Sequence, residues 1–490
     1  MGREKDWQIE QEERGWWSIR DKYVCADCFD EEYLKQVVRE NVAAPTCGYC
    51  GVTGEELTGE KGSLIAAPFD SVMQVIAEGI QLEWNNADDE GIPYESAEGG
   101  YQARTLDSHD LVWEYVCPNN EALARDITEA LPDQVWVGRH YWSLSRGQAL
   151  WYGWENFCRV VKHENRYMFH LHGPRRQARE SAGTEASPSG AAIPVGEPPP
   201  AGAAEAAQAS DASADARNGA ATPFDISLQD LPPDEGIQDF EEAIAEANEG
   251  VSASRMLDAL GEAVEDVGLI RKVRRSTRFY RARVGPANEP YRSARKLGPP
   301  PPRKAKASRM SPAGIPMFYG ALEEYTAIAE CVQGRLKKGK VANVGAFIAT
   351  EEFLVLDLTN LEPIPSLFAG QADLRQVLGF LHSFVRDLSK PIKKDDRVHI
   401  EYVPTQIVTE YFRHSFECPD GQPVRGILYP SSRAPGGTAC VLFFIREECG
   451  APQRGPFRGR TKQWLRFVRK SAKAFDKKPR APGPNVLRLT

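Results

Sequence analysis

Four cysteines near the start of the chain have the residue type and spacing of a metal-binding site. They form two C-x-x-C pairs, Cys25 with Cys28 and Cys47 with Cys50, and 18 residues separate the pairs. Each pair can present two thiolates on one turn, and two such turns can supply the four corners of a tetrahedral zinc site. A redox-active pair is the alternative, but it leaves the second pair unexplained. The spacing predicts structural zinc, because four protein ligands leave no open coordination position.

Arginine, tyrosine, glutamate and serine stand in short motifs in the second half of the chain. Arg281 lies in Y-R-A-R, Arg309 and Tyr319 lie in R-M-S-P-A-G-I-P-M-F-Y-G, Glu330 ends A-I-A-E, and Ser431 follows the proline of Y-P-S-S. Each alone has an ordinary explanation, such as a salt bridge, a core aromatic residue, an exposed helix position or a turn. These residues can act in one site only if the fold brings them together. Whether it does depends on the strands and helices that carry them.

Apolar periodicity and Gly or Pro punctuation predict strands and helices around these motifs. β-prone segments occur at 279–284, 345–348, 353–358, 427–429 and 439–445. Helical spacing of apolar residues occurs at 254–268, 323–332 and 374–387. The segment 334–341 imitates a phosphate-binding loop, but Val341 replaces the Ser or Thr that would hold magnesium. We expect a basic surface turn there.

Composition divides the chain into modules. Residues 181–222 contain 15 alanines and two large apolar residues, so they bury too little surface to offset the entropy of ordering. We therefore predict a domain at 1–173, a disordered Ala/Pro/Gly/Ser-rich linker at 174–235, a second domain at 236–450 and a basic tail at 451–490.

The charges are distributed unevenly along the chain. Residues 1–173 carry 15 basic and 31 acidic side chains, a net charge of -16, whereas residues 450–490 carry 12 basic and one acidic, a net charge of +11. The tail around Trp464 is predicted to form an amphipathic helix over 461–475. Three alternatives stand for the tail: a solvated segment, docking onto the acidic front of the same or a second copy, and binding to nucleic acid or anionic lipid.

The apolar runs are far shorter than the roughly 18 residues that a membrane span requires. The charged start also lacks the apolar core of a secretory signal. We expect a cytoplasmic protein without a membrane span, in which ten cysteines do not form a disulfide framework.

The motifs of the second half resemble the RES domain, which is named for its Arg, Glu and Ser and forms the toxin half of many bacterial toxin–antitoxin pairs. The resemblance covers roughly 250–446 and includes Y-V-P-T-Q at 402–406. It implies a fold similar to ADP-ribosyltransferases and consumption of NAD⁺. The nicotinamide glycosidic bond is then cleaved by hydrolysis or phosphorolysis, or ADP-ribose is transferred to a protein.

The resemblance implies a role for each matching residue. Glu330 would stabilise the positive charge that develops on the ribose. Arg309, with Arg281 as a further basic contact, would bind the pyrophosphate. Tyr319 would offer an aromatic face to the nicotinamide ring. Ser431, chosen over its neighbour because it follows the proline directly, would hold a ribose or amide group.

The first half resembles the HEPN/RES N-terminal domain, through Y-V-C-A-D-C, P-T-C-G-Y-C and the segments 67–72 and 93–101. HEPN domains are helical bundles, and their RNase members carry Arg, four to six residues, then His. Only three residues separate Arg159 from His163, which would share one face of a helix over 151–163. The departure favours a sensing, inhibitory or scaffolding module over an RNase.

Together these inferences predict a multidomain α+β protein. A helical HEPN-like N-terminal domain with a zinc knuckle at 20–55 would precede the linker and a mixed α/β RES domain with an ADP-ribosyltransferase-like β core. We expect an NAD⁺ glycohydrolase or phosphorylase, a toxin-like effector in bacterial defence that its N-terminal domain regulates. The alternatives are a protein ADP-ribosyltransferase and a nucleic-acid-associated binding protein. Expected partners are NAD⁺, a separately encoded antitoxin and a second copy, while the acidic front disfavours nucleic acid.

Overall fold

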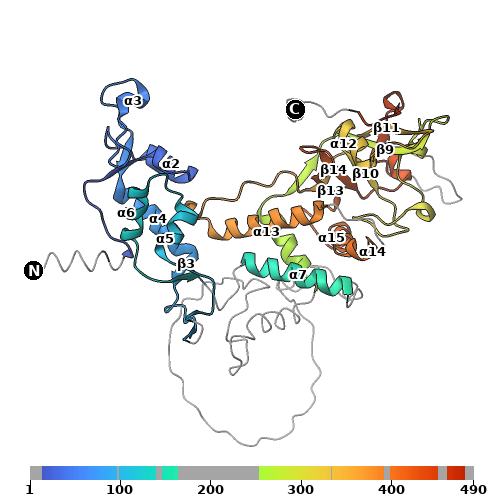
Figure 1. The fold of residues 1–490 in the computed structure, drawn as a ribbon. Helices are drawn as coiled ribbons and strands as arrows, with labels where there is room; N and C mark the ends of the chain where they lie inside the picture. The colour runs from blue at the N-terminus through green and yellow to red at the C-terminus, as the bar shows by residue number, and fades with distance from the viewer. Residues whose placement is uncertain are drawn as a thin grey trace, which may run out of the picture.

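The computed structural model of the 490-residue chain describes two units (Figure 1). The described residues are 11, 14–96, 99–139, 146–163, 253–332, 334–390, 398–450 and 461–479. The predicted linker at 174–235 lies outside them. We call 11–139 the N-terminal unit, and 146–163 together with 253–479 the C-terminal unit.

The N-terminal unit is mainly helical, with small sheets at its edges. Its helices are η1 (Ala26–Cys28), α2 (Glu32–Glu40), α3 (Gly54–Thr58), α4 (Phe69–Glu83), α5 (Ser108–Leu111), the π-helix η2 (Val112–Val116) and α6 (Glu121–Ala130). Its strands are β1 (Tyr23–Cys25), β2 (Ala66–Pro68), β3 (Trp84–Asn86), β4 (Tyr94–Glu95), β5 (Gly100–Tyr101), β6 (Thr105–Leu106) and β7 (Trp136–Gly138). The helix α4 organises this core because Phe69, Met73, Ile76 and Ile80 recur at helical spacing and are buried.

The C-terminal unit is built on a nine-stranded mixed sheet in the order β15-β11-β9-β10-β14-β13-β12-β8, with β16 also paired to β11. Its strands are β8 (Ile270–Val273), β9 (Arg278–Pro286), β10 (Phe318–Ala321), β11 (Lys340–Ala349), β12 (Phe353–Asp357), β13 (Val424–Pro430), β14 (Thr438–Leu442), β15 (Leu465–Phe467) and β16 (Lys473–Phe475). The strands β12 and β13 run parallel, and the other pairs are antiparallel. All five predicted β-prone segments lie on strands of this sheet, although β14 ends at Leu442, three residues before the predicted end.

Helices cover this sheet. They are α7 (Arg146–His163), α10 (Ala253–Asp266), α11 (Ala294–Leu297), α12 (Glu324–Cys331), α13 (Ala372–Ser389), α14 (Val398–Glu401) and α15 (Val403–His414), with the short helices η6 (Pro302–Lys304), η7 (Leu367–Ala369), η8 (Glu447–Cys449) and η9 (Arg469–Ser471). The three predicted helices at 254–268, 323–332 and 374–387 are confirmed as α10, α12 and α13. The segment 334–341 is an exposed turn leading into β11, as expected.

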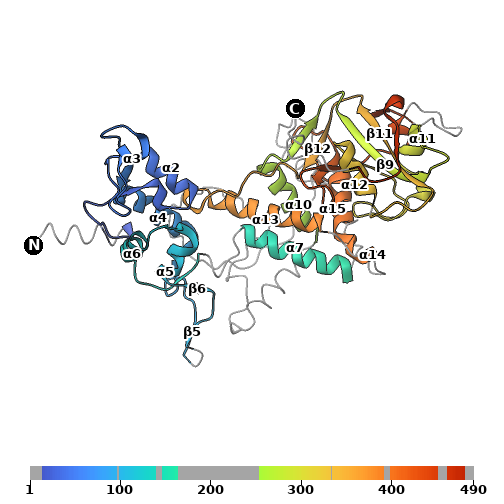
Figure 2. The ribbon, with the colours of Figure 1, turned by 45° about the horizontal axis from the view of Figure 1, so that its top comes forward.

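The helix α7 precedes the linker in the sequence but packs inside the C-terminal unit. It lies along α13 in both views (Figure 2), and it shares one hydrophobic core with α10, α13, α15 and the sheet. Trp154 meets Phe384 of α13 edge-on, with ring centroids 4.9 Å apart. The C-terminal unit is therefore completed by a segment from the other side of the linker.

The described part of the basic tail forms strands, so the predicted helix over 461–475 is wrong. Residues 465–467 and 473–475 pair antiparallel with β11 and extend the sheet. The edge of β11 offers unpaired backbone groups, and such an edge favours strand addition over an isolated helix. Leu465 is fully buried, and Trp464 stacks on Phe444 with ring planes 8° apart. The tail docks within its own chain, on the sheet rather than on the acidic front.

Within the described residues, no helix combines the length and the apolar character that a membrane crossing needs.

Candidate active site and cysteine cluster

Glu330 and Ser431 make direct contact in the predicted site. Glu330 lies near the end of α12, and Ser431 follows β13. The Ser431 hydroxyl donates to Glu330 Oε1 at 2.5 Å and accepts from the backbone amide of Ala434 at 3.1 Å. Ser431 is 7% exposed, whereas the Glu330 side chain is 30% exposed. A buried hydroxyl thus holds a carboxylate that solvent can still reach, while the neighbouring Ser432 is exposed.

The turn after Ser431 packs closely on α12. The Ser431 amide donates to the carbonyl of Gly437 at 2.9 Å, which closes the turn. A methyl group at Gly437 would lie 2.2 Å from Thr326 Oγ1, so only glycine lets the turn approach the helix this closely. Because Thr326 and Glu330 are four residues apart, this approach brings Ser431 to the face that carries Glu330.

Arg309 is held at both its backbone and its side chain. Its carbonyl accepts from Thr405 Oγ1 at 2.5 Å, and Gln406 Nε2 donates to the carbonyls of Ser308 and Ser311, so the Y-V-P-T-Q motif anchors this loop. The guanidinium donates to the carbonyls of Leu388 and Lys390 at the end of α13. Burial lowers the pKa of Arg309, while nearby tyrosines and Glu330 oppose that effect.

Tyr319 lies in β10, beside the same loop. Its hydroxyl is 2.9 Å from Ser311 Oγ, which fixes the ring, and burial raises its pKa. Tyr429, on β13, is a second half-buried tyrosine of this region. Burial raises its pKa well above the ordinary value, and the charge of Glu330 adds to the shift. Both tyrosines are therefore neutral hydrogen-bonding groups.

Arg281 reaches the region from the other face of the sheet. Tyr280 pairs with Ala321, so strand alternation directs Tyr319 to the face of Tyr280 and Arg281 to the opposite face. The Arg281 guanidinium donates to the carbonyl of Tyr319 at 2.5 Å, and burial lowers its pKa to about 10. Its buried Nε has no hydrogen-bond partner among the described residues.

A cleft of about 260 Å³ lies beside Tyr319. Four cationic side chains line it, namely Arg281, Arg283, Lys304 and Lys306, and none of the described residues that line it carries a carboxylate. Ser308, Ser311 and Tyr319 add hydroxyl groups to the wall. The cleft is therefore positively charged, and an anionic group would be attracted to it.

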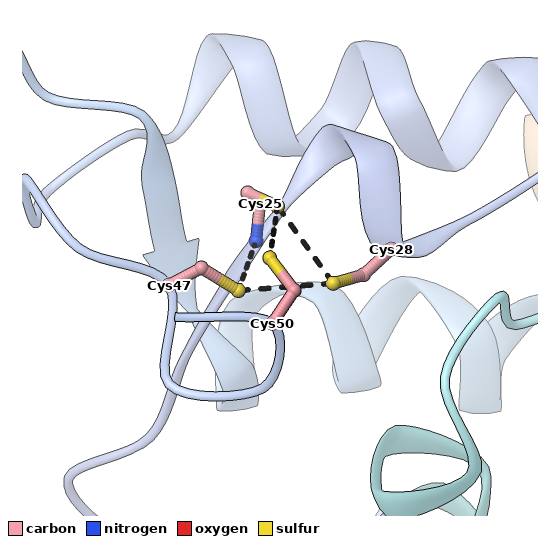
Figure 3. Close-up of side chains that lie close together, drawn as sticks. All are labelled: Cys25, Cys28, Cys47 and Cys50. Atoms are coloured by element: carbon pink, nitrogen blue, oxygen red, sulfur yellow. Dashed lines mark hydrogen bonds between the residues drawn. The ribbon is translucent and has the colours of Figure 1, made fainter. Parts of the chain in front are cut away.

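The four predicted metal ligands meet in one cluster (Figure 3). Cys25 Sγ lies 3.7 Å from Cys28 Sγ and 3.5 Å from Cys50 Sγ, and Cys28 Sγ lies 3.7 Å from Cys47 Sγ. Four sulfurs about 2.3 Å from one zinc are about 3.8 Å apart, so the cluster has the size of a tetrahedral site. Backbone amides of Cys25 and Tyr49 also point at Cys47 Sγ, which stabilises a thiolate. The donor set therefore fits zinc.

Arg159 and His163 share α7, which confirms the predicted helix over 151–163. Both side chains are exposed, and Arg159 donates to Asn156 on the same helix at 3.0 Å. Their helix packs its buried face into the core of the C-terminal unit.

Two family models match the chain, and each unit contains matched residues. Residues 40–175 match HEPN/RES N-terminal domain 1, and residues 278–460 match the RES domain. The chain therefore contains a HEPN/RES N-terminal domain followed by a RES domain. The two domains indicate a toxin–antitoxin-type effector family whose chemistry is related to NAD. No curated protein and no solved structure matches the chain.

The RES domain of this chain uses elements beyond its matched residues. The strand β8 lies before residue 278, and β15 and β16 lie after residue 460, yet all three belong to the same sheet. The match to the HEPN/RES N-terminal domain includes α7, which packs against α13 of the RES domain. A helix that the match assigns to the N-terminal domain is therefore packed in the RES domain.

Several residues around the candidate site were not anticipated from the sequence. Arg433 Nε lies 3.9 Å from Glu330 Oε2, Tyr429 lies beside it, and Lys304 and Lys306 line the cleft. The two lysines carried a usable signal, because they follow a run of four prolines that leads into the Arg309 loop. Arg433 carried none, since only the turn after Ser431 brings it to Glu330.

Proposed function

We propose that the protein consumes NAD⁺ by cleaving the bond between nicotinamide and ribose, with water or phosphate as the acceptor. The observation that carries the proposal is the Ser431–Glu330 hydrogen bond, which fixes a partly exposed carboxylate in the turn beside α12. The likeness to an ADP-ribosyltransferase core, expected from the motifs, is part of the proposal. The family assignment supports it, because the RES domain is NAD-related.

Glu330 would act on the ribose. As the bond from ribose C1′ to the ring nitrogen breaks, its electron pair moves to the nitrogen and the leaving nicotinamide becomes neutral. Positive charge then develops on the ribose, and a carboxylate held in place stabilises that charge without reorganising. The acceptor oxygen bonds to C1′ and releases its proton. No general acid is needed on the leaving side, in contrast to an ordinary glycosidase.

The cationic cleft would bind the pyrophosphate. Arg281, Arg283, Lys304 and Lys306 line it and supply positive charge that would attract the phosphates. Tyr319 lies at the border of the cleft, where its ring can contact the nicotinamide. Arg309 retains donors beyond the two that α13 occupies, because a guanidinium has five N–H groups. These residues bind and orient, whereas Glu330 acts on the reacting atoms.

The reaction is tested by incubating the purified full chain with NAD⁺, with and without phosphate, and separating the products. Free ADP-ribose indicates hydrolysis, its phosphorylated form indicates phosphorolysis, and label retained on protein supports the ADP-ribosyltransferase alternative. Glu330→Gln should lower kcat by about 100-fold or more. Glu324→Gln is the matched control, because Glu324 lies on the same helix and pairs with Lys473 instead. Unchanged NAD⁺ consumption in Glu330→Gln would refute the assignment.

We also propose that Cys25, Cys28, Cys47 and Cys50 hold a structural zinc ion. The ion would tie η1 to the loop before α3, and its binding would be linked to folding of this region. Metal analysis of the purified full chain should find about one zinc per chain. Cys25→Ser should lose it, while Cys117→Ser, a thiol outside the cluster, should retain it. A zinc-free, folded wild-type chain would contradict this proposal.

A further inference from the structure

The start of α13 is anchored in the HEPN/RES N-terminal domain. Leu367 and Phe368, which precede this helix, are buried in the core that α4 organises. A methyl group at Gly79 of α4 would lie 2.6 Å from Phe368 Cδ1 and 3.0 Å from its Cα. Glycine at this position therefore lets the two backbones approach, and the RES domain contributes core residues to its neighbour.

An ion pair holds the first turn of α13 next to this anchor. Arg375 Nη1 lies 2.7 Å and 3.1 Å from the two carboxylate oxygens of Glu83, the last residue of α4. The side chains are only 26% and 14% exposed. Burial raises the pKa of Glu83, and Arg375 opposes that rise. Losing the arginine would leave a buried carboxylate without its partner, so this pair resists separation of the two helices.

The far end of α13 holds Arg309. The carbonyls of Leu388 and Lys390 accept from its guanidinium, and Ser389 Oγ lies 3.5 Å from the carbonyl of Pro430, which precedes Ser431. A cation at a helix C-terminus is also favoured by the helix dipole. One helix end therefore contacts two parts of the candidate site.

The helix between these ends is a continuous 18-residue element, about 27 Å long. It runs from the N-terminal unit toward the sheet in both views (Figures 1 and 2). Its middle packs on α7, where Phe384 meets Trp154 and where Gln376 leaves no room for a side chain at Gly147. Because a continuous helix packed in this way is stiff, a shift at Phe368 would be expected to move the carbonyls that hold Arg309.

We propose that the HEPN/RES N-terminal domain positions Arg309 through α13, with Phe368 and Arg375 as positioning residues for the site. The kinetic test of this proposal rests on the proposed NAD⁺ chemistry. The helix α13 would be the physical connection through which the N-terminal domain regulates the site. A change in the N-terminal domain that moves α4 would alter turnover without touching the substrate.

The test uses the full chain carrying Arg375→Gln. We expect kcat/KM for NAD⁺ to fall about 3- to 10-fold and amide hydrogen exchange in 305–312 to quicken. In an Arg309→Lys background the same change should have no further kinetic effect, because the arginine through which it acts is gone. The control is Arg104→Gln, since Arg104 Nη2 also contacts both oxygens of one carboxylate, Glu114, but that pair joins two segments of the N-terminal unit instead of α4 and α13. It should change neither readout.

Two results would overturn the proposal. One is unaltered exchange in 305–312 for Arg375→Gln; the other is an equal kinetic loss with and without Arg309. If Arg375→Gln does not fold, Phe368→Leu keeps an apolar anchor and should give the same pattern at smaller amplitude. A wild-type chain that leaves NAD⁺ intact would refute the proposed function alone, because the exchange measurement still decides whether α13 couples the two domains.

Discussion

Replacing Ser431 by alanine isolates the contact on which the proposed mechanism depends. The change removes the 2.5 Å hydrogen bond to Glu330 and leaves the amide of Ala434 without its acceptor. A hydrogen bond to a charged group contributes about 1.5–3 kcal/mol. If that energy is needed to hold the carboxylate in the transition state, kcat should fall about 13- to 160-fold. KM should change less, because the contact orients Glu330 and does not bind the substrate's phosphates.

The assay is steady-state consumption of NAD⁺ by the full-length wild type, Ser431→Ala and Ser432→Ala. Ser432 is the matched control, since it is the adjacent residue in the same turn and is exposed. Its variant should retain wild-type kcat and KM. Thermal unfolding of each variant distinguishes a lost site from a lost fold. Wild-type turnover in a folded Ser431→Ala chain, or an equal loss in Ser432→Ala, would refute the assigned role.

Two further predictions concern the joined architecture. Trp154→Ala should destabilise the RES domain by about 3–5 kcal/mol, because it removes a buried side chain of α7. Trp151→Ala, at an exposed position of the same helix, should not. Equal urea midpoints for the two variants would show that the packing of α7 does not stabilise the domain. Burial raises the pKa of Glu83 in the folded chain above its value in the unfolded chain. The contribution of Glu83 to stability is therefore fully present at pH values below its pKa in the unfolded chain, and it is lost as the pH rises through its pKa in the folded chain. Arg375→Gln should therefore destabilise the chain more at about pH 8 than at about pH 5, as measured by unfolding midpoints at the two pH values. In a chain that also carries Glu83→Gln, this pH difference should disappear.

Local patterns in the sequence determined the elements and the chemical groups. The C-x-x-C pairs predicted a four-cysteine cluster because cysteine spacing within a turn limits where the thiols can point. Apolar periodicity predicted five strands of the large sheet and the helices α10, α12 and α13, because such periodicity follows from burial of one face. The ordered motifs identified the family, which the domain matches confirm. Each of these signals is contained within a few neighbouring residues or in their order.

Tertiary structure alone decided how these parts combine. Residues 461–475 are amphipathic enough for a helix, but the free edge of β11 captures them as strands because it offers backbone partners that an isolated tail lacks. The helix α7 joins a core formed beyond the linker, and Phe368 joins a core formed before it, because burial depends on contacts that sequence distance does not predict. For the same reason the link between Glu330 and Ser431, 101 residues apart, emerges only when Gly437 lets a turn close onto α12.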